Sequence, residues 1–349
     1  MKNNPFSLEF GVQPPEYIDR FREISEIKED FSSLIPPTHL YAILGPRGCG
    51  KTVMLNDIYH SFKDKEGWIA VDLNCKSDLL LQLAASLDDK VKTFHKDISA
   101  EFSFSFSFLS VTLKGKEHVS NVIVLLEKMF AVLSRHNRKV LITIDDVVNN
   151  EYVAVFVKQF QSLRGKNMPV FLVMTGIYSA FNRIQGQDGL TFLQRAPKIY
   201  LAPLNQKAIA ASYQSVLGVP LDEAVKLAAF TKGYAFAYQC LGYLLVKNGK
   251  TKIDEEILGK MDYYLEEGVY GKLFEELSEK EKTILLFVAS RGIVSNQDLL
   301  IEGVLSKDTV SFYKSSLERK GIIEMPARGE MAIALPRFAE FILAQNAMD

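Results

Sequence analysis

Short apolar runs separated by amphipathic stretches dominate the first half of the chain. Four of these runs have the length and composition of buried strands, and they span residues 40–44, 68–73, 140–144 and 170–174. Helical patterns lie between them, among them residues 21–34, which end before Pro36-Pro37, and residues 51–62, which follow a glycine-rich loop. Short buried strands that alternate with helices predict an α/β fold, with a parallel sheet covered by helices on both faces.

One segment departs from this alternation. Four phenylalanines, from Phe102 to Phe108, alternate with serines and give the period of two that is typical of a strand with one apolar face. Lys114-Gly115-Lys116 ends the pattern. We expect a β-hairpin insertion near residues 101–116, packed against the main sheet. The alternative is an edge that contacts a partner or substrate, since an uncharged alternating strand pairs readily when it is left uncovered.

The next part of the chain is helical. Apolar positions at helical spacing predict four helices, at residues 206–217, 221–232, 235–247 and 254–267.

The pattern changes again from residue 272. Ser278 with Glu281 three residues later forms a capping box that begins a helix, and two further helices are predicted at 295–304 and 307–320. Gly321 ends the last of these, and residues 322–325 and 331–335 predict two strands around Arg328-Gly329. Three helices followed by a two-stranded wing predict a winged-helix module.

Length and composition agree with several packed domains. At about 100–200 residues per domain, 349 residues predict two or three, with boundaries near 204 and 270. Apolar residues at 48% and charged residues at 24% exclude pervasive disorder. The 41 Lys and Arg against 42 Asp and Glu give a net charge of -1. Binding to nucleic acid or to a membrane surface would therefore need a local patch.

The termini and the cysteines predict a cytoplasmic protein without a membrane span. The amino terminus lacks the apolar core of a signal peptide, and the most apolar stretch, residues 121–133, is interrupted by Glu127 and Lys128. The three cysteines and five histidines are scattered, which argues against a disulfide framework and against a zinc site.

The glycine-rich loop carries the clearest chemistry. Gly45-Pro46-Arg47-Gly48-Cys49-Gly50-Lys51-Thr52 matches the P-loop pattern G-x-x-x-x-G-K-[ST] in full. Its glycines let successive N–H groups point at phosphate oxygens, and the following helix adds its positive end. We expect Lys51 to reach the β- and γ-phosphates of ATP and the Thr52 hydroxyl to bind Mg²⁺. The expected nucleotide-binding residues here are Pro46, Arg47, Gly48, Cys49, Gly50, Lys51, Thr52 and Val53.

Acidic residues follow a second buried strand. Residues 140–144 lead directly into Asp145 and Asp146. We expect Asp145 to bind Mg²⁺, directly or through water, and Asp146 to polarise the attacking water. Alternatively, Asp146 only caps a turn before Asn149-Asn150. If it does act, an aspartate where many P-loop ATPases carry glutamate predicts slow hydrolysis.

Two further residues are candidates for catalysis. Thr175 ends the next strand and is placed to sense the γ-phosphate, unless it only satisfies local backbone groups. Arg195 precedes a final strand at 198–201 and is a candidate arginine finger, with an ordinary surface arginine as the alternative. Asn74, at the end of strand 68–73, is a weaker candidate for coupling nucleotide state to a partner site.

These motifs together resemble the AAA+/STAND group of P-loop ATPases, in particular the archaeal-ATPase-like branch near the origin-recognition ATPases. The P-loop wording and Asp145-Asp146 carry the resemblance. So do residues 15–24, where the family has a box beside the adenine, and residues 231–239, which lie in the family's helical lid.

The resemblance covers nearly the whole chain. It implies an ATPase core at 1–204, a lid at 205–270 and a winged helix at 271–349, and it implies that Ile18 and Arg20 lie beside the adenine. It also implies an ASCE-type core, with the strand that ends in the catalytic acid lying between the P-loop strand and its neighbour. Asp19 stands where the family has glycine, and the lid has no arginine at the family's second sensor position.

The winged helix raises the question of DNA. Its third helix offers Lys307, Lys314 and Arg319, and its wing offers Arg328. In such modules these elements contact the major groove and the phosphate backbone. However, residues 272–349 hold ten Lys and Arg against twelve Asp and Glu, a net charge of -2. Since nucleic-acid binding normally shows a basic footprint, docking of a protein is an equal alternative.

Three functions therefore remain open. The first is an ATP- and Mg²⁺-dependent ATPase switch that couples nucleotide state to the winged helix. The second is a DNA-binding replication or transposition accessory, or a regulator, in which ATP is structural. The third is a protein-interaction scaffold that hydrolyses little ATP, either with a partner or by self-association.

Overall fold

The computed structural model describes residues 4–94, 98 and 118–348, and the chain divides into two compact units. The sheet unit comprises Arg20–Leu44 and Lys51–Ile199. The helical unit comprises Met1–Asp19, Gly45–Gly50 and Tyr200–Asp349. The P-loop glycines thus group with the helical unit, although the strand before them and the helix after them belong to the sheet unit. The expected hairpin insertion at 101–116 lies outside the described residues.

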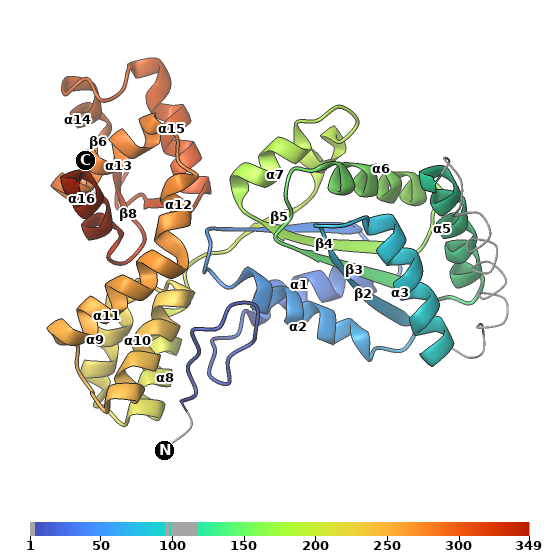
Figure 1. Ribbon diagram of the computed structural model, residues 1–349, viewed down its shortest axis with the longest axis horizontal. Coiled ribbons are helices and arrows are strands. Elements are labelled where there is room, and N and C mark those ends of the chain that lie inside the picture. The colour runs from blue at the N-terminus through green and yellow to red at the C-terminus, as the bar shows by residue number, and fades with distance from the viewer. Residues whose placement is uncertain (1–3, 95–97, 99–117, 349) are drawn as a thin grey trace. The chain divides into compact units, whose positions relative to one another are not determined.

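A five-stranded sheet forms the centre of the sheet unit (Figure 1). Its strands are β1 (Leu40–Leu44), β2 (Trp68–Asn74), β3 (Lys139–Asp145), β4 (Val170–Gly176) and β5 (Lys198–Tyr200). The order is β2-β3-β4-β1-β5, and β1, β2, β3 and β4 pair in parallel. The parallel α/β core predicted from the sequence is confirmed.

One expected detail of this sheet is wrong. The strand that separates the P-loop strand β1 from the acid strand β3 is β4, which carries Thr175, whereas we expected the acid strand in that place. The order of strands is decided by crossover connections, and a linear apolar pattern does not contain it.

Helices cover both faces of the sheet. They are α1 (Phe21–Ser32), α2 (Lys51–Lys63), α3 (Leu79–Phe94), α5 (His118–Arg135), α6 (Glu151–Gly165) and α7 (Tyr178–Gln185), with a 3₁₀ turn η1 (Thr191–Arg195). Alternate residues of β1 face opposite sides. Leu40, Ala42 and Leu44 join the apolar core that includes α3, α5 and α6, while Tyr41 packs against Phe31 of α1.

Four helices and an amino-terminal segment form the first part of the helical unit. The helices are α8 (Gln206–Leu217), α9 (Leu221–Phe230), α10 (Ala235–Asn248) and α11 (Glu255–Leu265), which a π-helical turn η2 (Glu266–Tyr270) extends. Phe6 is buried against Tyr213 of α8 and Tyr238 of α10, at ring-centroid distances of 5.8 and 5.5 Å. The helices agree with the sequence prediction within a few residues.

The rest of the helical unit is the winged-helix module. It consists of α12 (Gly271–Glu275), α13 (Glu279–Arg291), β6 (Val294–Ser295), α14 (Asn296–Ile301), α15 (Lys307–Arg319), β7 (Ile323–Glu324), β8 (Glu330–Ile333) and α16 (Phe338–Met348). The capping box of Ser278 and Glu281 begins α13, as expected. The small antiparallel sheet has the order β6-β8-β7. The pattern did not predict β6 or α16.

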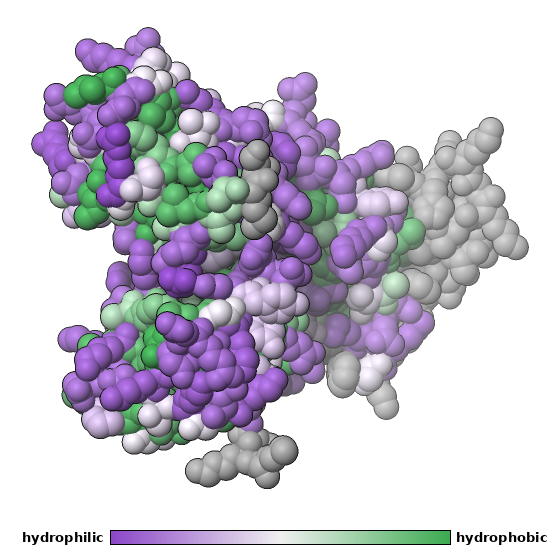
Figure 2. All heavy atoms as spheres, turned by 60° about the vertical axis from the view of Figure 1, so that its left-hand side comes forward, coloured by the Kyte–Doolittle hydropathy of each residue, from purple (hydrophilic) through white to green (hydrophobic). Residues whose placement is uncertain are grey.

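Apolar side chains remain at the surface of this module. Figure 2 shows hydrophobic side chains among hydrophilic ones on the module, and Ile293, Ile301 and Phe312 are more than half exposed. Among the residues that the structure describes, no helix is both long and apolar enough to cross a membrane.

Candidate nucleotide site

The glycines of the P-loop adopt backbone angles that other residues avoid. Gly48 and Gly50 have φ of 73° and 95°, in the left-handed region that glycine enters without a Cβ clash. A Cβ on Gly48 would also lie 2.6 Å from the hydroxyl oxygen of Tyr234. Lys51 begins α2 directly after this loop and is 8% exposed, and the neighbouring Val53 is half-buried. The left-handed backbone at these two glycines fits the curled loop that a phosphate-binding backbone needs.

Within the sheet unit, a hydrogen-bonded network joins the three polar residues that the sequence singled out. The Thr52 hydroxyl donates to Asp145 Oδ2 at 2.7 Å. The Thr175 hydroxyl donates to Asp145 Oδ1, and it accepts the backbone N–H of Asp146 at 2.9 Å. Thr52 begins α2, Asp145 ends β3 and Thr175 lies near the end of β4, so the carboxyl edge of the parallel sheet brings them together. The hydroxyl of Thr52 and the carboxylate of Asp145 thus lie side by side, and oxygen atoms are the ligands that Mg²⁺ prefers.

Asp146 has a strained backbone. Its φ is 47°, its side chain is exposed, and its main chain is fixed by Thr175 and by the carbonyl contact with the Cys75 thiol at 3.5 Å. The side-chain cap of the following helix α6 comes from Asn150, which accepts the N–H of Val153, and not from Asp146. Aspartate is one of the few residue types other than glycine that enter this left-handed region readily.

Other candidates lie apart from this network. Arg195 ends η1 and is exposed, and no hydrogen bond among the described residues joins it to Thr52, Asp145 or Thr175. Ile18 is half-buried in the helical unit, whereas Arg20 caps α1 in the sheet unit. The Asn74 side chain accepts the N–H of Lys76 and closes a local turn.

Of the two segments that carried the resemblance, residues 15–19 of the first and residues 231–239 of the second belong to the helical unit, and there they meet at Glu16 and Gln239. Gln239 of α10 donates to the carbonyl of Glu16 at 2.6 Å and accepts the N–H of Ser7 at 2.9 Å. Phe10 stacks on Phe236 with ring centroids 4.9 Å apart. Part of the segment expected beside the adenine therefore packs on α10, which the sequence pattern did not indicate.

The start of α10 also holds the P-loop. The Tyr234 hydroxyl donates to the carbonyl of Arg47, and the N–H of Phe236 donates to the carbonyl of Gly48 at 3.0 Å. The Arg47 guanidinium forms an ion pair with Glu276 at 2.8 Å. A Cβ on Gly321, where α15 ends, would lie 2.7 Å from Cδ of Pro46. Sequence reasoning named Gly321 only as the end of a helix and did not single out Glu276, since no motif links either residue to the P-loop.

The sheet order, the loop between β1 and α2, and the acid-ended strand β3 define the chain as a P-loop ATPase with a winged helix at its carboxyl end. A family model described as an ATPase domain predominantly from Archaea matches residues 17–209, and the chain belongs to that family. A second family model, for a domain of unknown function, matches residues 267–342. Membership of the ATPase family implies nucleotide binding.

Solved structures support the same fold. A Walker-type ATPase of Pyrococcus abyssi is 16% identical, covers 93% of this chain and 96% of its own, and superposes with a TM-score of 0.61. The ORC2 protein of Aeropyrum pernix, in ADPNP–ADP complexes, is 11% identical, covers 98% of each chain and has a TM-score of 0.55. A search of curated proteins finds no match. At identities of 16% and 11%, these structures show that the fold is shared.

Proposed function

We propose that this protein binds ATP with Mg²⁺ at the P-loop, hydrolyses it slowly, and passes the nucleotide state to the lid and the winged helix. The observation that carries the proposal is the network of Thr52, Asp145 and Thr175 beside the start of α2. It presents the hydroxyl of Thr52, one residue after the P-loop lysine Lys51, together with the carboxylate of Asp145 from the end of β3.

Each residue has a proposed task. Lys51 holds the β- and γ-phosphates, and Thr52 with Asp145 holds Mg²⁺, which neutralises phosphate charge when it is bound. Thr175 orients the Asp145 carboxylate. Asp146 polarises the attacking water, and its carboxylate is one methylene shorter than a glutamate would be, which is the reason for expecting slow turnover. Arg195 acts as a finger only where another domain or subunit brings it to the phosphate.

We propose that the nucleotide state is passed from the P-loop to the winged helix through the lid, residues 205–270. The carbonyls of Arg47 and Gly48 are bonded by Tyr234 and by the N–H of Phe236. A phosphate that reorders this backbone therefore changes hydrogen bonds at the start of α10. We propose three domains for this transmission: an ATPase core at 1–204, a lid at 205–270 and a winged helix at 271–349.

A turnover assay with ATP and with GTP, combined with two variants, tests the ATPase. Lys51→Ala is expected to abolish nucleotide binding. Asp146→Asn is expected to keep binding and to lower turnover by at least about tenfold. Asparagine adopts φ near 50° as readily as aspartate does, so this change leaves the fold intact and isolates the chemistry. Absence of adenine- or guanine-nucleotide binding at millimolar concentration in the parent protein would falsify the proposal.

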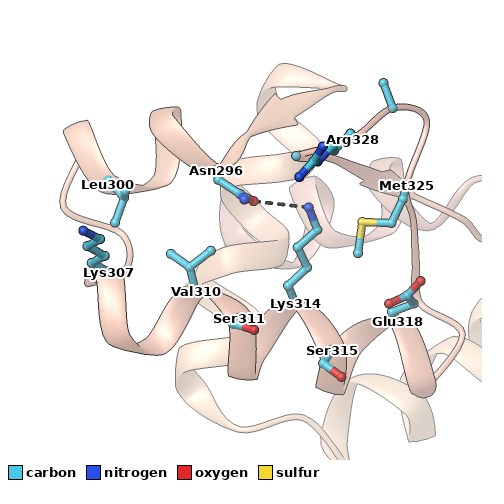
Figure 3. A pocket seen from close by; sticks show the side chains of 12 residues that line it. Asn296, Leu300, Lys307, Val310, Ser311, Lys314, Ser315, Glu318, Met325 and Arg328 are labelled. Atoms are coloured by element: carbon cyan, nitrogen blue, oxygen red, sulfur yellow. Dashed lines mark hydrogen bonds between the residues drawn. The ribbon is translucent and has the colours of Figure 1, made fainter.

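A groove in the winged helix favours DNA as a second proposed ligand. The groove has a volume of about 520 Å³ and lies between α15, the start of α14 and the wing (Figure 3). Lys307, Lys314 and Arg328 line it, against the single carboxylate of Glu318. In Figure 3, Lys314 and Arg328 point toward the groove from α15 and from the wing, and Lys314 Nζ lies 3.2 Å from Asn296 Oδ1.

The module's excess of acidic residues lies elsewhere. Glu276, Glu281 and Glu302 form ion pairs with Arg47, Lys320 and Arg291, none of which lines the groove. The net charge of the module therefore understates the positive charge of the groove itself, and the groove could engage backbone phosphates.

Duplex binding at two salt concentrations tests this second role. Lys314→Ala and Arg328→Ala are each expected to weaken binding and to lower the slope of log affinity against log salt by about one. Lys280→Ala, which removes an exposed lysine outside the groove, is the matched control. Binding that is absent, or equally weakened by the control, would leave a protein partner as the occupant of this module.

A further inference from the structure

A second cavity lies in the sheet unit, at the amino ends of the strands, whereas Asp145 and Thr175 lie at the carboxyl ends of β3 and β4. It has a volume of about 340 Å³ and is formed by residues 63–70 together with Lys90 and Arg138. Trp68 is the first residue of β2, and Asn74 at the other end of that strand belongs to the nucleotide edge. The seven residues of β2 place its two ends roughly 20 Å apart. This cavity is therefore distinct from the P-loop.

Positive charge in the cavity exceeds negative charge. Lys63, Lys65, Lys90 and Arg138 line it, against the carboxylates of Asp64 and Glu66. Lys65 Nζ is bonded to the hydroxyl of Ser32, and Lys90 Nζ lies 3.3 Å from the hydroxyl of Tyr59. Across the described part of the chain, no ion pair joins Lys63, Lys65 or Lys90 to a carboxylate.

The surroundings of Lys65 add further positive charge. Burial lowers the pKa of Lys65, and the positive charges of Lys28 and Lys139 lower it further. Lys65 and Lys139 both lie over the indole of Trp68, at 5.9 and 5.4 Å from Nζ to the ring centroid. A bound anion would stabilise lysines that, like Lys63, Lys65 and Lys90, have no carboxylate partner among the described residues, and it would favour their charged forms.

We propose that this cavity binds a small multivalent anion of the phosphate class, independently of the P-loop. Lys65 and Lys90 bind the anion by charge-assisted hydrogen bonds. The site does not depend on the proposed ATPase function, because no residue of the P-loop, β3 or β4 lines it.

The single tryptophan of the chain makes the proposal testable. Trp68 is the only Trp, so its emission reports on this cavity alone. Inorganic tripolyphosphate is titrated into Lys51→Ala, the variant that removes binding at the P-loop, at constant ionic strength set with chloride. We expect a saturable change in emission, and isothermal calorimetry on the same variant is expected to give the same affinity.

Two added substitutions and a control decide the outcome. Lys65→Ala and Lys90→Ala, each in the Lys51→Ala background, are expected to weaken the affinity by about tenfold. Lys90 makes no ring contact with Trp68, so its variant keeps the baseline emission. Lys207→Ala, an exposed lysine of α8, should leave the affinity unchanged. The absence of saturable binding, or equal affinity in all variants, would overturn the proposal.

Discussion

Thr175 shows how one hydroxyl can organise the reacting edge of the sheet. It is fully buried, and its oxygen both donates to Asp145 and accepts from the backbone of Asp146. With its single hydrogen directed at Asp145, its position fits a residue that orients the Asp145 carboxylate, which we propose binds Mg²⁺. The sequence suggested direct sensing of the γ-phosphate, which would need that hydrogen to be redirected.

Replacement of Thr175 by valine separates these roles. Thr175→Val keeps the shape but removes the fully buried hydroxyl that bonds both the N–H of Asp146 and the Asp145 carboxylate, so the free energy of unfolding should fall by about 1–3 kcal/mol. If Thr175 orients Asp145, the Mg²⁺ concentration for half-maximal turnover rises, and Thr175→Ser restores it. An unchanged Mg²⁺ dependence together with lost discrimination between ATP and ADP would indicate sensing instead. Urea unfolding and Mg²⁺ titrations of turnover provide the measurements.

His39 predicts a pH dependence of stability. Its ring stacks on Phe171 at 4.6 Å, and burial, followed by the charges of Arg164 and Lys139, lowers its pKa to about 4. Between pH 4 and 6.5 the unfolded chain therefore binds the proton more readily than the folded one does. Stability from this residue is fully present above pH 6.5 and is lost as the pH falls toward 4.

The His39→Gln variant measures this contribution. Because the ring is only half-buried, solvent reduces the effect, and we expect the variant to lose about 1–2 kcal/mol less than the parent between pH 6.5 and pH 4. His136→Gln, at an exposed position, is the comparison. Parallel pH profiles of urea unfolding for the parent and His39→Gln would contradict this assignment.

At the scale of the elements, α10 is the helix on which several segments meet. It binds the amino-terminal segment through Gln239, and its start holds the P-loop carbonyls. Gly242 allows the closest approach, because a Cβ there would lie 2.6 Å from Cγ of the buried Phe6.

Two glycine substitutions test this packing. Gly242→Ala is expected to lower the free energy of unfolding by about 1–3 kcal/mol, because the Phe6 ring must move in a packed core. Limited proteolysis should then release the segment of residues 4–19 first. Gly259→Ala in α11 meets nothing within 4 Å and is expected to stabilise the protein by roughly 0.5–1 kcal/mol. Equal effects of the two changes would contradict the close approach at Gly242.

Most elements could be predicted from their patterns, and the exceptions have physical reasons. β1 to β4 are continuous apolar runs, and Ser278 with Glu281 marks the start of α13. β6 has two residues, too few to show a period, and α16 is apolar without a polar face that would reveal its spacing. The place of β3 in the sheet was predicted wrongly because strand order depends on contacts between distant segments.

At the scale of the whole molecule, the P-loop and the carboxyl-terminal part of the chain are linked through Arg47 and Glu276. Both side chains are about one third exposed, so the pair itself contributes little to stability. Its importance lies in position, because it joins the P-loop to a residue of the winged-helix module, directly after α12.

We expect Glu276→Gln combined with Tyr234→Phe to uncouple the P-loop from the carboxyl-terminal part of the chain. ATP affinity should change by about two- to fivefold, and the nucleotide-dependent hydrogen exchange of α10 should be reduced. Glu279→Gln removes the ion pair with Lys282, which does not involve the P-loop, and is expected to leave both measurements as in the parent. Full nucleotide-dependent protection of α10 in the double variant would show that coupling follows another route.

The sequence by itself determined the α/β core, the phosphate-binding loop and the winged helix, because each depends on local spacing: apolar runs, glycines at fixed offsets, and a capping box. It also brought out Thr52 from the P-loop pattern, and Asp145 and Thr175 because polar residues at the carboxyl ends of parallel strands share one edge of the sheet. Only the tertiary structure decided that β4 separates β1 from β3, that α10 and Glu276 hold the P-loop, and that Lys307, Lys314 and Arg328 of the winged helix line one groove. The first two features depend on contacts between residues more than a hundred positions apart, and the third depends on which side chains line the groove. Neither kind of contact produces a periodic pattern in the sequence.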